Sequence, residues 1–383
     1  MVSKDSNGIR HYFDWAATAP HAGIASDAPF GNPSSQHKEG REAKLVLEDA
    51  RKRCAAVLNV PPNTLYFTSG GTESNSIAVL FNLLRKGQGR VISSLAEHSS
   101  IREGMETLVK MGKPTGNISI DSSGRANADF FENALKKYGD VRFAAVMAVN
   151  NETGAVTDIA SLREIKKRSE PGIHFHCDMV QAVGKIPFDI PLWEIDSASI
   201  SAHKIGGPRG IGLLYLRRPV EVFYTGGGQE NRIRGGSENT QGAVELASCL
   251  EQSAGDKTRE EYARAKTRWN KLITSLAAID RCTIIPQERL GDKEEDGFSP
   301  YILQVAFRDI PGEVMARALD DLGFAVSTGS ACSSSSPERP VLAAMGISEK
   351  LRIEGIRISQ GWTTTDAEID LLLDAINEVL KFL

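Results

Sequence analysis

The feature that most constrains the fold is a regular alternation between residues 64 and 216, where short apolar runs take turns with helical stretches. The apolar runs are rich in β-branched and aromatic residues, which is typical of strands. The expected strands are residues 64–68, 90–94, 142–149, 173–178, 197–201 and 212–216. The expected helices are residues 72–85, 99–111, 128–138 and 159–169. Strands that alternate with helices in this way predict an α/β fold with a largely parallel sheet.

The pattern changes beyond residue 240. A long, charged helical stretch covers residues 241–276. After it we expect strands at 281–285 and 301–307, and helices at 311–322 and 365–380. This order of elements indicates a second, smaller α+β domain. We therefore expect a large domain over residues 13–251 and a small domain made of residues 1–12 and 252–383.

Length and composition exclude several classes of protein. The chain has 383 residues, 41% of them hydrophobic, which is enough for a large core without disulfides or metals. Its 45 basic and 49 acidic residues give a net charge of −4, which excludes a broadly basic nucleic-acid binder. No apolar run approaches the roughly 20 residues that span a bilayer, and residues 1–10 lack the apolar core of a signal peptide. We therefore expect a cytoplasmic protein with no membrane partner.

The five cysteines are odd in number, widely spaced and free of CxxC pairs, so neither a disulfide framework nor a zinc knuckle is expected. Cys54 and Cys249 fall in helical patterns and Cys177 alternates within a strand, which favours small buried side chains. The pattern around Cys282 is undetermined. Cys332 lies in the small-residue run 327–337 (STGSACSSSSP), where we expect a mobile loop with an exposed thiol.

Three segments suit a ligand with anionic groups. Residues 68–75 (TSGGTESN) follow an expected strand and open a helix, where free N–H groups would meet a phosphate; an ordinary N-cap is the alternative. Lys204, in SAHK at 201–204, follows another strand at the crevice of the sheet. It is a candidate Schiff-base nucleophile, with a surface lysine as the alternative. Arg357, in the apolar run 355–359, would either clamp a carboxylate or form an internal salt bridge.

One strand carries two histidines and an aspartate. The alternation at 173–178 (IHFHCD) puts His174, His176 and Asp178 on one face, which allows the start of a metal site. The other interpretation needs only Asp178, with Gln181 nearby. A buried carboxylate requires a partner, and a protonated ring nitrogen would be one.

Taken together and in this order, these segments resemble the cysteine desulfurases of the class V aminotransferase family, which are pyridoxal-phosphate enzymes of fold type I. The resemblance covers nearly the whole chain. The motifs that carry it are YFDWAAT (12–18), GNPSS (31–35), AEH (96–98), VNNETG (149–154), AHK (202–204), SAC (330–332) and Arg357. It implies the α/β type I fold of these transferases, with a mostly parallel seven-stranded sheet in the large domain and a smaller α+β C-terminal domain.

The resemblance also implies a role for each residue of the expected site. Lys204 would hold pyridoxal 5′-phosphate as an internal aldimine and then move a proton on the bound substrate. Asp178 would pair with the pyridinium nitrogen and keep the ring an electron sink. His98 would stack on the ring, and Gln181 would bind its phenolic oxygen. The residues implied for the cofactor phosphate are Gly71, Thr72, Ser201, His203 and, reaching the other subunit of a homodimer, Ser237.

The implied substrate is L-cysteine, with Asn151 and Arg357 on its carboxylate and Asn151 also beside the cofactor. The Cys332 thiolate would attack the substrate sulfur, releasing alanine and leaving a persulfide, with His98 as proton acceptor. The sulfur would pass to an acceptor protein for iron–sulfur cluster or thiocofactor synthesis. Three departures from the family pattern are the short segment 21–30, Met179 beside the cofactor and Ser237 in place of a threonine.

Other activities fit parts of the same sequence. Within the fold, a selenocysteine lyase or an aminotransferase would use the same cofactor. Outside it, a metal hydrolase would use His174, His176 and Asp178, and an inactive scaffold would only bind partners. The Cys332→Ala variant separates a desulfurase from an aminotransferase, because only the desulfurase needs the thiol.

Overall fold

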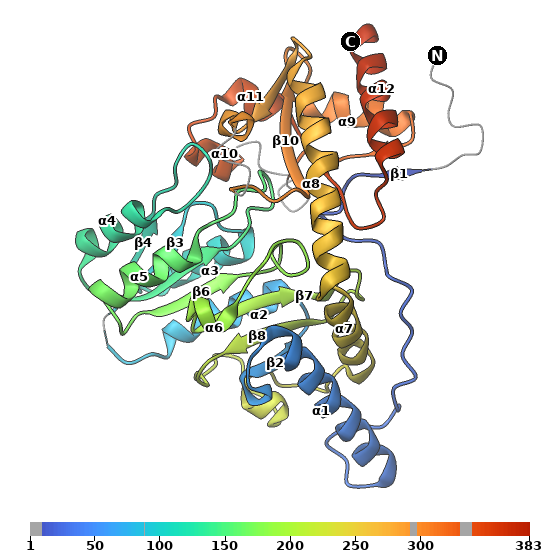
Figure 1. The fold of residues 1–383 in the computed structure, drawn as a ribbon. Helices are drawn as coiled ribbons and strands as arrows, with labels where there is room; N and C mark the ends of the chain where they lie inside the picture. The colour runs from blue at the N-terminus through green and yellow to red at the C-terminus, as the bar shows by residue number, and fades with distance from the viewer. Residues whose placement is uncertain (1–9, 88, 292–296, 330–338) are drawn as a thin grey trace.

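The computed structural model describes residues 10–87, 89–291, 297–329 and 339–383 (Figure 1). Its main sheet has seven strands in the order β2-β8-β7-β6-β5-β3-β4. They are β2 (Leu65–Thr68), β3 (Arg90–Ser94), β4 (Thr115–Ile118), β5 (Val141–Met147), β6 (His174–Asp178), β7 (Ser197–Ser201) and β8 (Gly212–Leu216). Neighbouring strands are parallel except around β8, which runs antiparallel to β2 and β7. The predicted α/β class with a mostly parallel seven-stranded sheet is confirmed.

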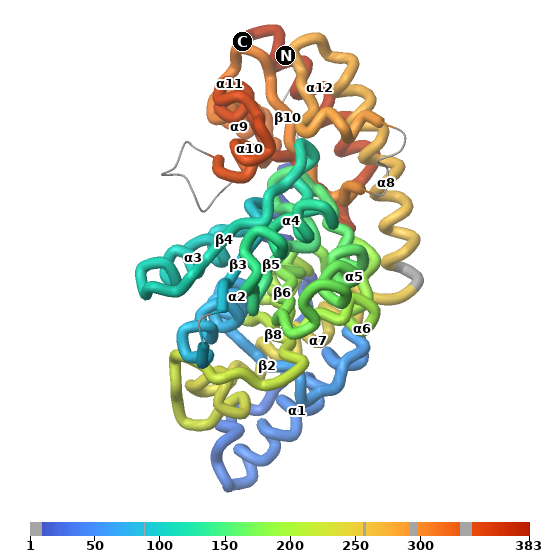
Figure 2. The backbone as a smooth tube through the Cα atoms, turned by 90° about the vertical axis from the view of Figure 1, so that its left-hand side faces the viewer, coloured from blue at the N-terminus to red at the C-terminus, as the bar shows by residue number. Residues whose placement is uncertain are grey.

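Helices cover both faces of this sheet, as expected where helices connect parallel strands. They are α1 (Lys38–Leu58), α2 (Gly71–Leu80), α3 (Ser99–Lys110), α4 (Ala128–Tyr138), α5 (Ile159–Ser169), α6 (Ile190–Trp193) and α7 (Thr240–Gln252). Figure 2 shows α2 and α3 on the opposite side of the strands from α5 and α6. The main core includes fully buried side chains such as Ile92, Phe131 and Phe175.

A second, antiparallel sheet in the order β12-β10-β9 lies above the main sheet in Figure 1. Its elements and the helices around it are β9 (Cys282–Ile285), β10 (Ile302–Phe307), β12 (Gly355–Ser359), α8 (Asp256–Ala277), α9 (Gly312–Asp321), α10 (Pro340–Ala344), α11 (Glu349–Glu354) and α12 (Asp366–Phe382). A separate apolar core, with Trp269, Val305 and Ile356, packs this sheet against α8 and α12. The division of the chain between residues 251 and 252 stays a proposal.

Two sequence-based expectations differ from the structure. The helical stretch expected over 241–276 is two helices, α7 and α8, because the chain turns at Gly255, whose φ of +97° lies in the left-handed region. Strand β4 was not expected, because its sequence TGNI has little strand propensity; it is a strand through its pairing with β3. Short 3₁₀ helices add the turns Pro62–Thr64, Phe81–Leu83, Ala202–Lys204, Gln229–Arg232 and Gln287–Leu290.

The N-terminal segment joins the two sheets. Strand β1 (His11–Tyr12) pairs with β11 (Phe324–Ala325), and Asp14 bridges to the end of β12. Farther along, the Ala19 N–H donates to the His203 carbonyl at 2.8 Å, just beyond β7. The backbone between these contacts therefore runs over the carboxyl ends of the main sheet.

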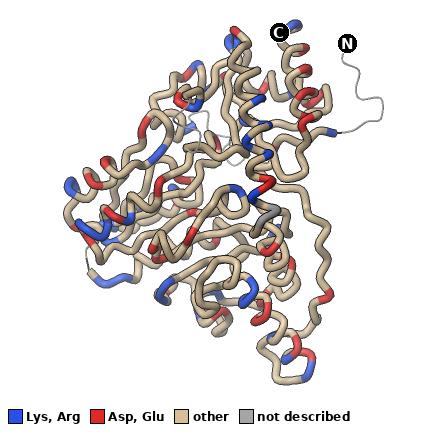
Figure 3. Tube along the Cα trace, in the orientation of Figure 1, with Lys and Arg blue, Asp and Glu red and all other residues tan. Residues whose placement is uncertain are grey.

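No helix within the described ranges is long and apolar enough to cross a membrane. Figure 3 shows Lys and Arg interspersed with Asp and Glu along the chain. This distribution agrees with the near balance of 45 basic and 49 acidic residues.

Candidate active site

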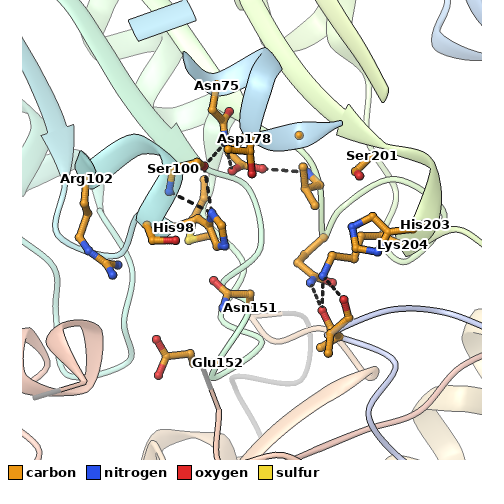
Figure 4. A pocket seen from close by; sticks show the side chains of 18 of the residues that line it. Asn75, His98, Ser100, Arg102, Asn151, Glu152, Asp178, Ser201, His203 and Lys204 are labelled. Atoms are coloured by element: carbon orange, nitrogen blue, oxygen red, sulfur yellow. Dashed lines mark hydrogen bonds between the residues drawn. The ribbon is translucent and has the colours of Figure 1, made fainter. Parts of the chain in front are cut away.

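A cavity of about 210 Å³ opens where the carboxyl ends of β6 and β7 meet the first turn of α2 and the N-terminal segment (Figure 4). Ten of the twelve residues expected in the site line it. They are Gly71, Thr72, His98, Asn151, Asp178, Gln181, Ser201, His203, Lys204 and Arg357. Ser237 is exposed and is not among the residues that line the cavity. Cys332 lies outside the described residues.

The first turn of α2 forms one end of the cavity. The helix begins at Gly71, and a Cβ there would lie 2.6 Å from Val180 Cγ2, so glycine lets the turn approach the segment after β6 this closely. The first N–H groups of a helix have no partner within it, which makes them available to an anion. Thr72 and Ser201 add hydroxyl groups to the same lining. This end of the cavity suits a phosphate.

Lys204 follows β7 on a short 3₁₀ turn. Its Nζ donates to the carbonyl oxygens of Ala16 and Ala17, each at 2.6 Å. The neighbouring His203 has its Nδ1 3.2 Å from Thr18 Oγ1. Burial, and then the positive charge of Lys204, lower the pKa of His203 to about 4. His203 is therefore neutral at pH 7, with one ring N–H to donate.

Asp178 ends β6 and is only 4% exposed. Its Oδ2 accepts a hydrogen bond from Asn75 Nδ2 at 2.7 Å, and its Oδ1 accepts one from the Val180 N–H at 2.9 Å. These bonds fix the direction of the carboxylate toward the cavity, where Figure 4 shows it beside Asn75. A carboxylate held in this way favours a positively charged ligand atom, such as a protonated ring nitrogen.

His98 is the N-cap of α3. Its Nδ1 accepts the Ser100 N–H at 3.2 Å and lies 2.9 Å from Ser100 Oγ. Burial lowers the pKa of His98, and the charge of Lys204 adds to this while Asp178 opposes it. The neutral His98 ring therefore borders the cavity between Asp178 and Asn151 (Figure 4).

Gln181 has a buried partner that the sequence did not reveal, Lys185. Gln181 Nε2 donates to the Ala16 carbonyl at 2.8 Å, and its Oε1 accepts from Lys185 Nζ at 2.5 Å. Burial, with the charges of Lys204 and Arg357, holds the pKa of Lys185 well below its usual range. The four-residue spacing could have indicated the contact, but a lysine is by default a surface residue.

Arg357 approaches the cavity from β12, opposite the phosphate end. Its NH2 pairs with Asp14 Oδ1 at 2.8 Å, and its NH1 donates to the carbonyls of Asn151 and Gly329 at 2.9 and 2.8 Å. The two alternatives from the sequence therefore coexist, because Arg357 forms an internal ion pair and also lines the cavity.

Glu152 is a further acid that the sequence did not single out. It lines the cavity below Asn151 in Figure 4, and its Oε2 is buried without a hydrogen-bond partner among the described residues. Burial raises the pKa of Glu152, while the charges of Arg339, Arg357 and Arg102 oppose the shift. Around this part of the cavity, three arginines thus lie near a carboxylate that has one oxygen without a hydrogen-bond partner among the described residues.

The histidines of β6 do not form a metal site in the part of the chain that the structure describes. His174, His176 and Asp178 do share one face, but His174 Nε2 and both ring nitrogens of His176 bind Ser197 or Asn75. No group of three or more His, Cys, Asp or Glu among the described residues could hold a metal ion. The geometry gives no support to a metal hydrolase.

Four of the five thiols are described, and none suits a nucleophile. Cys54, Cys177 and Cys249 are buried as expected, and Cys282, undetermined from the sequence, is partly buried against the second core. Burial raises the pKa of Cys54 and Cys282 to about 12 and that of Cys249 to about 11. At neutral pH these groups remain thiols rather than reactive thiolates.

The aminotransferase class-V family profile matches residues 11–372. The cysteine desulfurase IscS of Dictyoglomus turgidum is 34% identical over 387 residues, which covers 97% of this chain and 94% of that protein. The cysteine desulfurase IscS of Vibrio cholerae is 34% identical over 382 residues, which covers 95% of this chain and 91% of that protein. The chain belongs to the aminotransferase class-V family, and within it to the cysteine desulfurases.

Solved structures agree with this assignment. A NifS-like protein superposes with a TM-score of 0.87 at 32% identity, covering 98% of this chain and 100% of that one. A NifS-like protein from Rickettsia africae gives a TM-score of 0.84 at 26% identity, covering 97% and 100%. The similarity thus extends over both sheets.

Proposed function

We propose that the protein is a cysteine desulfurase that converts L-cysteine to L-alanine and leaves a persulfide on Cys332. The observation that carries the proposal is the convergence of Lys204, Asp178 and the first turn of α2 on one cavity, with Arg357 at its other end. In the overall reaction the C–S bond of cysteine breaks, an S–S bond forms on the enzyme thiol, and the thiol proton ends on alanine.

The residues of the cavity fit pyridoxal 5′-phosphate. Gly71, Thr72, Ser201 and His203 would hold its phosphate, and Asp178 would accept a hydrogen bond from its protonated ring nitrogen. His98 would cover the ring, Gln181 would bind its phenolic oxygen, and Lys204 would attach its aldehyde carbon. When bound, the cofactor supplies an electron sink for cleavage beside the substrate Cα. Lys204, freed from it by substrate, would hold the transferred proton.

The other end of the cavity would bind the substrate carboxylate. The Arg357 guanidinium is already aimed by Asp14 and by two backbone carbonyls. The Asn151 side chain lines the same part of the cavity. An oriented guanidinium with an amide beside it recognises a carboxylate by direction as well as charge.

Cys332 would be the sulfur acceptor, since burial disfavours the thiolate at each of the four described cysteines. Its thiolate would attack the substrate sulfur once a base has taken the thiol proton. A persulfide survives only where thiols stay reduced, so we propose a cytoplasmic protein that passes sulfur to an acceptor protein for iron–sulfur cluster or thiocofactor synthesis. Ser237, exposed on this chain, would reach the cofactor phosphate of the partner in a homodimer.

Mass spectrometry of the protein after treatment with L-cysteine tests the proposal. We expect a gain of one sulfur atom, mapped to Cys332, together with alanine. The Cys332→Ala variant should keep the cofactor absorption but lose sulfide release, and Cys282→Ala serves as the matched control with normal release. Alanine formation that continues unchanged in Cys332→Ala would instead favour a lyase.

A further inference from the structure

A series of buried polar groups leads away from Asp178, beginning with Asn75, which also lines the cavity. Asn75 Nδ2 binds Asp178 Oδ2 at 2.7 Å, and Asn75 Oδ1 lies 3.0 Å from His176 Nε2. His176 Nδ1 and His174 Nε2 each lie 2.8 Å from Ser197 Oγ. Asn75, His176 and Ser197 have no exposed surface. These three side chains therefore form their hydrogen bonds with one another and with neighbouring protein groups, and not with bulk water.

Both histidines of this series are uncharged at neutral pH. Phe143 stacks against both rings, with centroids 5.4 Å from His174 and 6.2 Å from His176, and Phe81 packs against His174. Burial in these surroundings lowers the pKa of His174 to about 4 and that of His176 to about 3. A neutral imidazole has one N–H donor and one acceptor nitrogen, so each ring passes a hydrogen bond in a single direction.

The Asp178 carboxylate decides that direction, because it only accepts hydrogen bonds. Asn75 must present Nδ2 to it, which leaves Oδ1 to accept from His176. The His176 proton is then on Nε2, and its bare Nδ1 accepts the hydroxyl proton of Ser197. Ser197 Oγ in turn accepts from His174 Nε2. In this hydrogen-bonded series, each group thus donates to the next one in the direction of Asp178.

A branch from the same amide reaches His98. Asn75 Nδ2 has a second proton, and Ser100 Oγ lies 2.8 Å from it. Ser100 then gives its own hydroxyl proton to His98 Nδ1, at 2.9 Å, where the Ser100 N–H also points. The neutral His98 ring therefore carries its proton on Nε2.

We propose that Asn75 is a positioning residue that sets two groups of the site at once: the carboxylate of Asp178 and the tautomer of His98. Its amide has both protons and its oxygen engaged, so it cannot turn without breaking contacts in both branches. The consequence for Asp178 is a fixed hydrogen-bond donor on Oδ2, so the carboxylate that would pair with the ring nitrogen of the cofactor keeps one orientation. The effect on the cofactor rests on the proposed function, whereas the direction of the hydrogen bonds does not depend on that function.

Nitrogen-15 NMR of histidine side chains in the full chain, with and without pyridoxal phosphate, tests the direction. We expect His98, His174 and His176 all to carry the proton on Nε2 in the cofactor-free chain. A His176 with its proton on Nδ1 would overturn the proposal. Ser197→Ala should return His174 to a mixture of tautomers and leave His98 unchanged; an altered His98 in this variant would also contradict the two-branch arrangement. Failure of the wild-type chain to bind pyridoxal phosphate would overturn only the proposed function.

The Asn75→Leu variant tests the effect on the site. Loss of a donor to a carboxylate should raise the dissociation constant of pyridoxal phosphate about 10- to 100-fold and shift the visible absorption of the bound cofactor. It should also release His176 to a mixture of tautomers. Asn82→Leu, at another buried asparagine seven positions along, should do none of this. Unchanged cofactor affinity in a folded Asn75→Leu protein would overturn the role of Asn75.

Discussion

The two ends of the cavity satisfy their polar atoms differently. We call the residues Gly71, Asp178, Ser201, His203 and Lys204 the sheet wall. We call the lining residues Glu152 and Arg357, together with their neighbours Asp14 and Arg339, the arginine wall. In the sheet wall, both oxygens of Asp178 accept hydrogen bonds and Lys204 Nζ donates two. In the arginine wall, Glu152 Oε2, Arg357 Nε and Arg339 NH1 are buried with no hydrogen-bond partner among the described residues.

This difference suits a permanently bound cofactor at the sheet wall and a substrate that binds and leaves at the arginine wall. Polar groups that already have partners keep their positions whether or not a ligand is bound. Buried groups left without partners gain most when a complementary ligand arrives. We therefore expect changes in the sheet wall to alter cofactor binding, and changes in the arginine wall to alter the affinity for substrate.

The largest effect is expected for Lys204→Ala. Without the amine, the cofactor has no covalent attachment and the proton transfer has no carrier, so alanine formation should fall at least about 10³-fold. Assays of alanine release and of visible absorption measure both losses. Lys110→Ala, at an exposed lysine of α3, is the control. Wild-type turnover in Lys204→Ala would remove this lysine from the chemistry.

Arg357→Leu should affect the other wall. Loss of an oriented guanidinium should lower kcat/KM about 10²-fold, mainly through KM, while the visible absorption of the cofactor stays unchanged. Steady-state kinetics over a range of L-cysteine concentrations measure this, with Arg308→Leu at an exposed ion pair as control. If the main effect were loss of the cofactor, the distinction between the two walls would fail.

Gly71→Ala probes the fit at the phosphate end. The added Cβ would lie 2.6 Å from Val180 Cγ2, so the turn must shift, and overpacking of this kind costs about 1–3 kcal/mol. We expect the dissociation constant of pyridoxal phosphate to rise roughly 10-fold or more in fluorescence titrations. The double variant Gly71→Ala/Val180→Ala should recover most of the affinity. An equally weak double variant would point to a cause other than this contact.

The smallest effect is a pH dependence from His176. Its pKa is about 3 in the folded chain, so on unfolding at pH 5.5 it takes up a proton that the folded chain excludes. The stability from this group is complete above its unfolded pKa of about 6.5 and is lost as pH falls, by about 1 kcal/mol between pH 7 and 5.5. Urea unfolding of His176→Gln should show a correspondingly smaller loss of stability between pH 7 and 5.5. An identical pH slope in His176→Gln would contradict the buried neutral ring.

Much of the sheet wall could be predicted from the sequence because local patterns fix it. The strands that end at Asp178 and at Ser201 were expected to within a residue of their bounds, and the carboxyl ends of neighbouring strands meet at one crevice. Gly70 and Gly71, at the start of α2, likewise indicate that an anion can approach the helix closely. The positions of Asp178 and Lys204 at the carboxyl ends of two strands were therefore enough to predict that they lie in one site.

Asn75 and Lys185 could not be predicted, because they act through contacts with other parts of the chain. Asn75 and Asp178 are 103 residues apart, and nothing in TSGGTESN distinguishes Asn75 from an ordinary polar helix residue. Lys185 would pass for a surface charge, although it is buried against Gln181. The roles of Asn75 and Lys185 depend on which residues they contact in the folded structure, and the sequence pattern does not show those contacts.

The pairing of β1 with β11 has a consequence for the order in which the protein is made. Arg357 and Asp14 are 343 residues apart, and the carbonyls that bind Lys204 belong to the same N-terminal segment. During synthesis the main sheet can form while the chain is still growing, but Asp14 must wait for Arg357, which is made 343 residues later. The cavity is thus completed only after residue 357 has been made, so a chain interrupted before that point would lack a complete cavity.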